Sequence, residues 1–299
     1  MKYFFAFTLF LAPLQLFAQQ QQPQMVTDPR TQKQVPLTQQ QPQQQQAPQI
    51  NVYRYDTVIT KDPQYPNKAE MKIYSSTGRL VKTGKVLNGK KEGIWRSYYE
   101  NGMISRVEEY HEDMLNGLTL SIEATGTVSE EDNIVNGVKT GVSHQYNRNG
   151  TIKLEENYSN GVLNGMRRVF GQDGKMQEEG NWKNGKRDSI NRWAYPSGKI
   201  YVEYTYKAGN ISGPARLYYE NGNVKAAGNY SEGYEEGAWK EYADTTQKVI
   251  AEGNYKAGKK IGVWKTYKSD GTPDKTQEYD ANGTLLKETP IVSVKQKVK

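Results

Sequence analysis

Glycine recurs along this chain with a period of 24 residues, and this period limits the possible folds more than any other feature. One set of glycines is spaced 24 residues apart: Gly78, Gly102, Gly126, Gly150, Gly174, Gly198 and Gly222. A second set is Gly89, Gly137, Gly161, Gly185, Gly209 and Gly233, with Asp113 filling the gap, and a third is Gly93, Gly117, Gly141, Gly165, Gly213 and Gly237, with Ser189 as the exception. One inserted residue within 244–247 shifts the pattern by one before it resumes at Gly258, Gly262 and Gly271. A fixed period over this length is typical of a protein built from stacked repeats.

Each repeat has the pattern of a β-hairpin. In the copy around Gly222, two short extended runs (213–219 and 223–230) flank the turn sequence Glu220-Asn221-Gly222, and a second turn follows at Gly233. Two such runs joined by Asn-Gly are a hairpin signature. No window shows helical spacing of apolar residues, and frequent glycine weakens any helix. The sequence therefore predicts an all-β fold.

Four sequence columns stay mostly apolar from copy to copy. They lie eight residues before the first-set glycine, four before it, two after it and eight after it, as Ile94, Tyr98, Ile104 and Tyr110 do in successive positions around Gly102. A two-residue loop would put the second and third columns on opposite faces. A three-residue loop, with glycine in the left-handed position of a bulged type I turn, would put all four columns on one face. We therefore predict the three-residue loop, with one apolar face as the core.

Charged residues also follow the period. A mainly basic column lies six residues before the glycine, on the predicted apolar face: Arg96, His144, Arg168, Arg192, Arg216, Lys240 and Lys265. An acidic column lies five residues after it, predicted on the opposite face: Glu131, Glu155, Glu179, Glu203 and Glu252. Long basic side chains can cover apolar surface with their stems, while glutamates keep an outer face soluble. The alternative interpretation is an alternating charged surface for a partner.

The aligned repeats resemble the MORN-variant family of short hairpin repeats. An aromatic-x-x-Gly-x-x-x-Gly pattern recurs from Tyr158, Tyr206, Tyr230 and Tyr255, with a variant from Trp182 that ends at Ser189, and Gly-x-Trp-x-x-Tyr begins at Gly93, Gly237 and Gly262. The copy at 118–141 departs most, because Leu120 replaces the basic residue and Ile122 and Ile134 replace aromatic ones.

The resemblance implies an elongated, single-layer antiparallel β-meander over residues 70–289, with a non-enzymatic role in binding. About sixteen strands at roughly 4.8 Å would give a sheet on the order of 75 Å long, with one face partly exposed. Similar bacterial proteins include antitoxin-like immunity proteins, and others in the wider family act in membrane-linked scaffolding. We expect another protein as the partner, with an anionic membrane surface or glycan as the alternative. The candidate binding face comprises Tyr98, Tyr146, Tyr158, Trp182, Tyr206, Tyr218, Tyr230, Tyr242, Tyr255, Arg168, Arg192 and Arg216.

The segments that flank the repeats have different compositions. Residues 1–18 have a positive start, a short apolar run and a small final residue, as in a secretory signal peptide cleaved after Ala18. Residues 19–50 are dominated by Gln and Pro and predict a disordered spacer. Residues 51–69 contain a possible edge strand, and residues 290–299 form a basic tail. We therefore expect export to the periplasm, outer envelope or exterior, without a lipoprotein anchor because the chain has no cysteine.

Composition argues against several chemistries. Without cysteine there can be no disulfide, thiol nucleophile or cysteine-ligated zinc site. The two histidines, His111 and His144, occupy different repeat positions and form no pair by pattern. No phosphate-binding glycine loop occurs, and basic residues alternate with acidic ones instead of forming the blocks of a nucleic-acid binder, despite a net charge of +7. We expect no catalytic site, metal, cofactor or nucleic acid.

Overall fold

The structure is a computed structural model that describes residues 25–27, 34–36 and 56–292. The chain divides into two units, 1–52 and 53–299. In the first unit, strands β1 (Met25–Thr27) and β2 (Gln34–Pro36) pair antiparallel. The predicted signal peptide, most of the predicted spacer and residues 293–299 of the basic tail lie outside the described residues.

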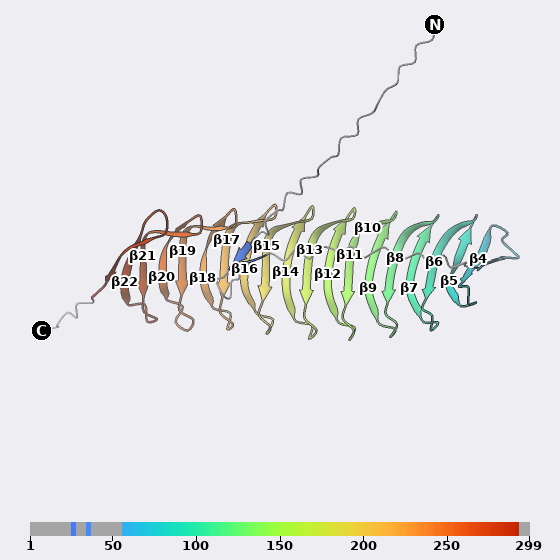
Figure 1. The fold of residues 1–299 in the computed structure, drawn as a ribbon, viewed down its shortest axis with the longest axis horizontal. Coiled ribbons are helices and arrows are strands. Elements are labelled where there is room, and N and C mark those ends of the chain that lie inside the picture. Colours follow the sequence, from blue (N-terminus) through green and yellow to red (C-terminus); the bar gives the residue numbers. More distant parts are fainter. Residues whose placement is uncertain (1–24, 28–33, 37–55, 293–299) are drawn as a thin grey trace, which may run out of the picture. The chain divides into compact units, whose positions relative to one another are not determined.

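The second unit is a single open antiparallel sheet of 21 strands in a meander, with its strands arranged in one row (Figure 1). Its strands are β3 (Asp56–Lys61), β4 (Lys68–Tyr74), β5 (Leu80–Leu87), β6 (Lys90–Tyr98), β7 (Ile104–His111), β8 (Met114–Ile122), β9 (Val128–Val135), β10 (Val138–Lys139), β11 (Gly141–Tyr146), β12 (Ile152–Ser159), β13 (Val162–Phe170), β14 (Met176–Lys183), β15 (Lys186–Ala194), β16 (Ile200–Lys207), β17 (Asn210–Tyr218), β18 (Val224–Ser231), β19 (Tyr234–Tyr242), β20 (Val249–Lys256), β21 (Lys259–Tyr267), β22 (Pro273–Tyr279) and β23 (Leu285–Pro290). Strands β10 and β11 flank Thr140 and both pair with β9.

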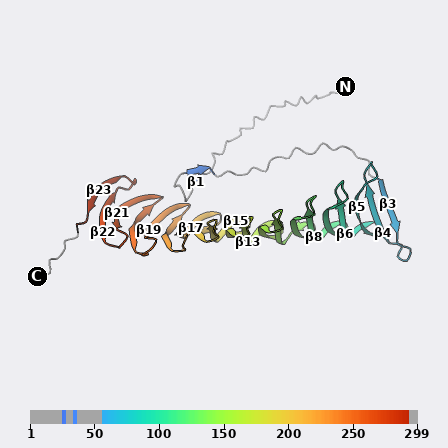
Figure 2. The same ribbon diagram turned by 90° about the horizontal axis from the view of Figure 1, so that it is seen from below.

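The predicted all-β repeat fold is confirmed. The side view shows the strands from β3 to β23 as one layer (Figure 2). There are more strands than the sixteen or so expected, and pairing extends from β3 at one edge to β23 at the other. Among the described residues there is no helix with the length and apolarity needed to span a bilayer.

Two kinds of turn alternate along the sheet. At the first kind, the Tyr99 N–H donates to the Met103 carbonyl at 2.8 Å and the Gly102 N–H donates to the Tyr99 carbonyl at 2.9 Å. Gly102 has a φ of 83°, so the predicted three-residue loop with left-handed glycine is confirmed. At the second kind, Asn88 and Gly89 have φ values of 51° and 79° between paired Leu87 and Lys90, as in a two-residue type I′ turn.

A β-bulge after each three-residue turn overturns the prediction that all four apolar columns share one face. Tyr98 pairs with Ile104, but Ser97 pairs with Arg106, so Ser105 is an extra residue in β7. Because side chains alternate along a strand, one extra residue reverses the face of everything beyond it. The column two after the glycine and the column eight after it therefore lie on opposite faces.

We name the two faces by the side chains around Gly102. Face A carries Trp95 with its cross-strand neighbour Glu108, and Tyr110 two residues further along β7. Face B carries Ile94, Arg96 and Tyr98 with their partners on β7. In repeat terms, face A holds the positions seven before and eight after the first-set glycine. Face B holds the positions eight, six and four residues before the first-set glycine, and the positions two and five residues after it.

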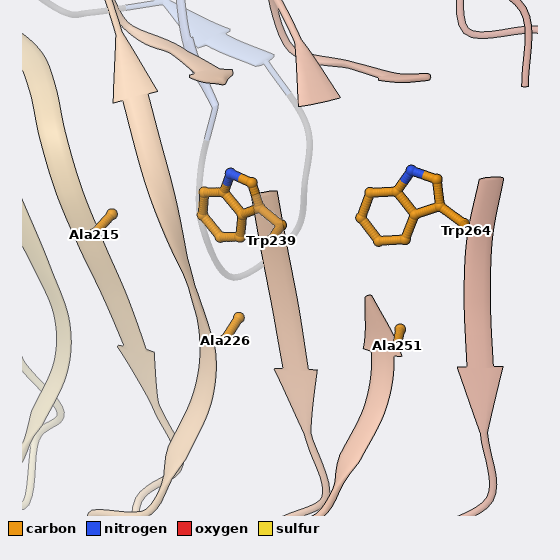
Figure 3. Close-up of a cluster of buried hydrophobic side chains, with 5 residues drawn as sticks. All are labelled: Ala215, Ala226, Trp239, Ala251 and Trp264. Carbon is orange, nitrogen blue, oxygen red and sulfur yellow. The ribbon is translucent and has the colours of Figure 1, made fainter. Parts of the chain in front are cut away.

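The core lies on face A, in two clusters. Near the start of the sheet, Val86, Trp95 and Tyr110 are buried together. Near its end, Ala215, Ala226, Trp239, Ala251 and Trp264 form the second cluster (Figure 3). The predicted core column eight before the glycine lies instead on face B and is mostly exposed, with Ile94 48% and Val263 53% accessible.

Ser189 occupies a strained backbone position that glycine fills in other repeats. Its φ is 57°, whereas the equivalent Gly93, Gly237 and Gly262 have φ values of 67°, 73° and 64°. A side chain in this left-handed region costs about 1–2 kcal/mol. We expect Ser189→Gly to raise the free energy of unfolding by about 1 kcal/mol in chemical denaturation. Ser189→Ala keeps a Cβ and should give no such gain; a gain from alanine equal to that from glycine would contradict the backbone explanation.

Candidate functional site

The twelve candidate binding residues do not share one face. Face A carries five of them: Tyr158, Trp182, Tyr206, Tyr230 and Tyr255. Face B carries the other seven: Tyr98, Tyr146, Tyr218, Tyr242, Arg168, Arg192 and Arg216. The reason is the bulge described above, so the binding site must be sought on each face separately.

Tryptophan and glycine form a repeated pair on face A that the column analysis missed. The Trp95 ring lies against Gly84 on the neighbouring strand, where a Cβ would come within 2.2 Å of the ring. Its indole N–H donates to the Lys85 carbonyl at 3.0 Å. The same arrangement joins Trp239 to Gly228 and Trp264 to Gly253. These three glycines lie outside the three periodic sets of turn glycines. Their presence within strands was the sequence feature that could have indicated a close contact with a tryptophan.

An unbroken series of aromatic contacts crosses the C-terminal part of face A. Its ring centroids are 5.0–6.2 Å apart and follow the order Tyr206, Trp193, Tyr204, Tyr230, Trp239, Tyr255 and Trp264. Most pairs are edge-to-face, the geometry that aromatic quadrupoles favour. At its ends, the Arg187 guanidinium lies 4.9 Å from the Trp193 centroid and the Lys260 ammonium 4.1 Å from the Trp264 centroid. These rings already use one another as packing partners.

Burial changes the titration of the tyrosines in this series. It raises the pKa of Tyr204 and that of Tyr255 each to about 12 from 10.0. Each of these tyrosines is neutral below its pKa, and its pKa is higher in the folded protein than in the unfolded chain. The stability that it contributes is therefore intact below about pH 10 and is lost as the pH rises through 12. We therefore expect alkaline unfolding that begins above pH 10. In a spectrophotometric titration of tyrosinate, Tyr204→Phe and Tyr255→Phe should each remove a late-titrating group; loss of an early one would contradict the assignment.

Charged side chains occupy the N-terminal part of face A and are paired with one another. The Lys82 ammonium donates to the Glu108 carboxylate at 2.7 Å, and Arg106 lies 3.1 Å from the same group. Burial opposes the ionisation of Glu108, but Lys82, Arg106 and the Tyr110 hydroxyl together outweigh it and lower the pKa of the carboxyl. Burial, with repulsion from Lys82, lowers the pKa of Lys91, which lies over the Tyr110 ring. These charged side chains of face A thus pair with one another or lie over its aromatic rings.

A ladder of ion pairs runs along face B, perpendicular to the strands. Successive contacts join Glu155, Arg168, Glu179, Arg192 and Glu203 at 2.7, 2.9, 3.2 and 3.0 Å. The basic and acidic columns were predicted on opposite faces, and that prediction is wrong. They face each other across each strand pair because the bulge moves the acidic column to face B.

Face B also presents one apolar side chain in each repeat, beside the ladder. These residues are Ile94, Leu118, Val142, Met166, Ile190, Pro214, Ala238 and Val263, and all except Met166 are exposed. Their cross-strand neighbours are short or acidic polar residues, such as Asn133 and Asn157, whose side-chain amides donate to the Val142 and Met166 carbonyls. An exposed apolar row of this length is typical of an interaction surface. We call these eight residues the apolar row.

Within the described residues, no three His, Asp or Glu side chains form a group that could hold a metal ion. The open pockets near β3 are lined by apolar residues such as Ile59, Ala69 and Val86 and, in the second of them, by charged residues such as Glu70 and Glu92. The arrangement on both faces is therefore suited to packing and surface recognition.

The fold and the apolar row define a hairpin-repeat protein with the surface of a binding module. Comparison with known families supports this class: residues 91–112, 163–184 and 212–232 match the MORN repeat variant. Three of the repeats are thus similar to the MORN repeat variant, as the resemblance implied, and repeats of this kind suggest a repeat protein involved in binding.

Other comparisons add little. No curated protein matches the chain. Among solved structures, a chain of the Photorhabdus luminescens Tc holotoxin pore is similar over 78% of this chain and 17% of its own length, with 11% identity and a TM-score of 0.14. The chain therefore spans less than one fifth of that structure.

Proposed function

We propose that this chain is an exported, non-enzymatic scaffold that binds another protein through face B. The observation that carries the proposal is the apolar row, with exposures of 48% at Ile94, 42% at Ile190 and 53% at Val263. Face A offers no comparable surface, since its aromatic side chains pack on one another and its charged groups are paired. An immunity-like or envelope-associated role is consistent with such a scaffold, and the N-terminal sequence supports export.

The pairing of charges on face B favours a protein partner over an anionic membrane or glycan. Arg168 and Arg192 each contact two glutamates, so a phosphate or sulfate group would have to displace those contacts. The aromatic side chains that would accompany these arginines in the alternative lie partly on the other face. We expect no salt-sensitive sedimentation with anionic vesicles; strong binding at low salt that disappears at high salt would favour the membrane alternative.

Capture from the cell envelope by crosslinking tests the proposal. A variant with lysine in place of Ile94, Ile190 and Val263 should lose a specific protein that the unaltered chain captures, because lysine cannot fill an apolar contact. The matched control adds the same charge at three exposed turn positions, Thr125→Lys, Gln172→Lys and Ser197→Lys, and should keep that protein. Equal capture by both variants would refute face B as the binding surface.

Export is tested separately by N-terminal sequencing of exported material. We expect the mature chain to begin at Gln19, after cleavage at Ala18. Recovery of the chain with Met1 intact in the exported fraction would contradict this part of the proposal.

A further inference from the structure

The most apolar part of face B lies over β8 to β13. A second row of exposed aliphatic side chains accompanies the apolar row there: Met114, Val138 and Val162, each four residues before Leu118, Val142 and Met166. Met114, Val138 and Val162 are 49%, 41% and 45% exposed, and Val135 beside Val138 is 50% exposed. In other repeats this second position holds Lys90, Lys186, Asn210, Tyr234 and Lys259. We call the six residues of the two rows, together with Val135, the aliphatic patch.

The charge ladder is interrupted beside the same patch. Leu120 stands where most repeats have Arg or Lys, and His144 stands in the next repeat. Glu131 pairs across the strands with these two residues. Each other glutamate in its column has an arginine or lysine as at least one of its strand neighbours. Glu131 accepts a hydrogen bond from the Tyr146 hydroxyl at 2.9 Å, but neither strand neighbour gives it a permanent positive charge.

The dimensions of the patch fit one α-helix lying across the strands. Its two rows are four residues apart in sequence on each strand, and short polar side chains (Asn116, Thr140 and Asn164) lie between them. Because residues 115 to 119 lie opposite only residues 110 to 108 of the neighbouring strand, the rows are closer together than the roughly 13 Å of a regular strand. A helix with its side chains is about 10–12 Å wide. Along each row, one aliphatic residue appears every second strand, or roughly every 9.6 Å. A helix repeats a residue on one face every seven positions, or about 10.5 Å, so three repeats stay nearly in register.

We propose that the aliphatic patch over β8–β13 binds an amphipathic α-helix of a partner protein, whose arginine or lysine pairs with Glu131. The inference deepens the proposed function, since it rests on face B being a protein-binding surface and identifies which repeats recognise the partner. The repeat at 118–141 departs from the others because it forms the specific part of an otherwise regular scaffold. The remaining apolar row extends the contact along the sheet.

A synthetic helical peptide tests this with the full chain. The probe has three heptads with leucine at two positions of each heptad and arginine beside them; a second peptide has glutamate in place of arginine, and a third has the composition of the first in scrambled order. Binding is measured by fluorescence anisotropy of the labelled peptide. We expect the arginine peptide to bind, the glutamate peptide to bind several-fold more weakly, and the scrambled peptide not to bind.

Variants of the chain locate the site. Val142→Lys should weaken binding of the arginine peptide by about tenfold or more, since it removes a covered aliphatic side chain. Glu131→Gln should weaken it by about two- to fivefold, as expected for a partly exposed ion pair, and should abolish the preference over the glutamate peptide. Ser197→Lys is the control, because Ser197 is an exposed turn residue outside the apolar row and adds the same charge, and this variant should bind normally. Circular dichroism should show the same sheet content in all three variants.

The outcomes separate this inference from the broader proposal. Equal losses in Val142→Lys and Ser197→Lys, or binding of the scrambled peptide as tightly as the arginine peptide, would overturn the helix site. If envelope capture depends on face B but the helical peptide does not bind, the inference fails and the proposed function stands. If the peptide binds at the patch while capture is insensitive to face B, the broader proposal fails and the helix site stands.

Discussion

Replacing Trp264 with alanine is expected to lower the free energy of unfolding by about 3–5 kcal/mol. The side chain is fully buried, contacts the Tyr255 ring at 5.0 Å between centroids and donates from its indole N–H to the Asn254 carbonyl at 3.1 Å. In a single sheet layer, no second layer can relax to refill the space that the indole leaves. The lost stability therefore combines the burial of the apolar indole, the cost of the cavity that it leaves and the contact with the Tyr255 ring.

The adjacent residue provides the control for this prediction. Val263 lies on face B and is 53% exposed, so Val263→Ala should change stability by less than about 0.5 kcal/mol. Because repeat arrays can unfold in parts, hydrogen exchange of the amides in β19–β21 should be measured together with chemical denaturation. Protection should fall in these strands first. Equal effects of the two substitutions would contradict the assignment of face A as the core.

Gly84→Val is expected to be similarly disruptive at the other end of the sheet. A Cβ at this position would come within 2.2 Å of the Trp95 ring, which is itself fully buried and cannot move into solvent without loss of its contacts. Overpacking of this kind costs typically about 1–3 kcal/mol and more where the neighbour is rigid. The expected result is a lower midpoint of thermal unfolding and weaker exchange protection in β4–β7.

The sign of this effect should reverse when the tryptophan is removed. In a Trp95→Ala background the space above Gly84 opens, and Gly84→Ala should then stabilise the strand by about 0.5–1 kcal/mol, because glycine is unfavourable within a strand. The double-mutant cycle comparing Gly84→Ala with and without Trp95 should therefore give a coupling energy above about 1 kcal/mol. An additive cycle would show that the two residues do not pack together as described.

Much of the fold was predictable because turns are encoded locally. The 24-residue glycine period predicted the repeats and the all-β hairpins, and the parity of the apolar columns predicted the three-residue loop at Gly102, which the structure confirms. The left-handed backbone that this glycine adopts restricts the types of turn that can join the two strands. Ser189 shows the same backbone requirement, since it has a positive φ where other copies have glycine.

The candidate site was predicted less well, and Trp95 and Arg168 show why. Trp95 stood out only as part of a family motif, since its repeat position holds Thr119, Ser143, Arg167, Asn191 and Ala215 in other copies and is not an apolar column. Its burial depends on Gly84 of the neighbouring strand. Arg168 was predicted to lie on the other face of the sheet from Glu155 and Glu179, with which it forms ion pairs. The prediction failed because the face of these two glutamates depends on the bulge that precedes each of them.

By itself the sequence determined the period, the positions of the two turns in each repeat and the identity of the residues in each column. Only the tertiary structure decided which columns share a face. An extra residue such as Ser105 is invisible in the periodicity, because the strand that follows the turn carries the same extra residue in each copy and the repeat length stays at 24. The hydrogen-bond register between strands fixes that residue as a bulge, and the bulge turns an apparent core column into the exposed row proposed here as the binding surface.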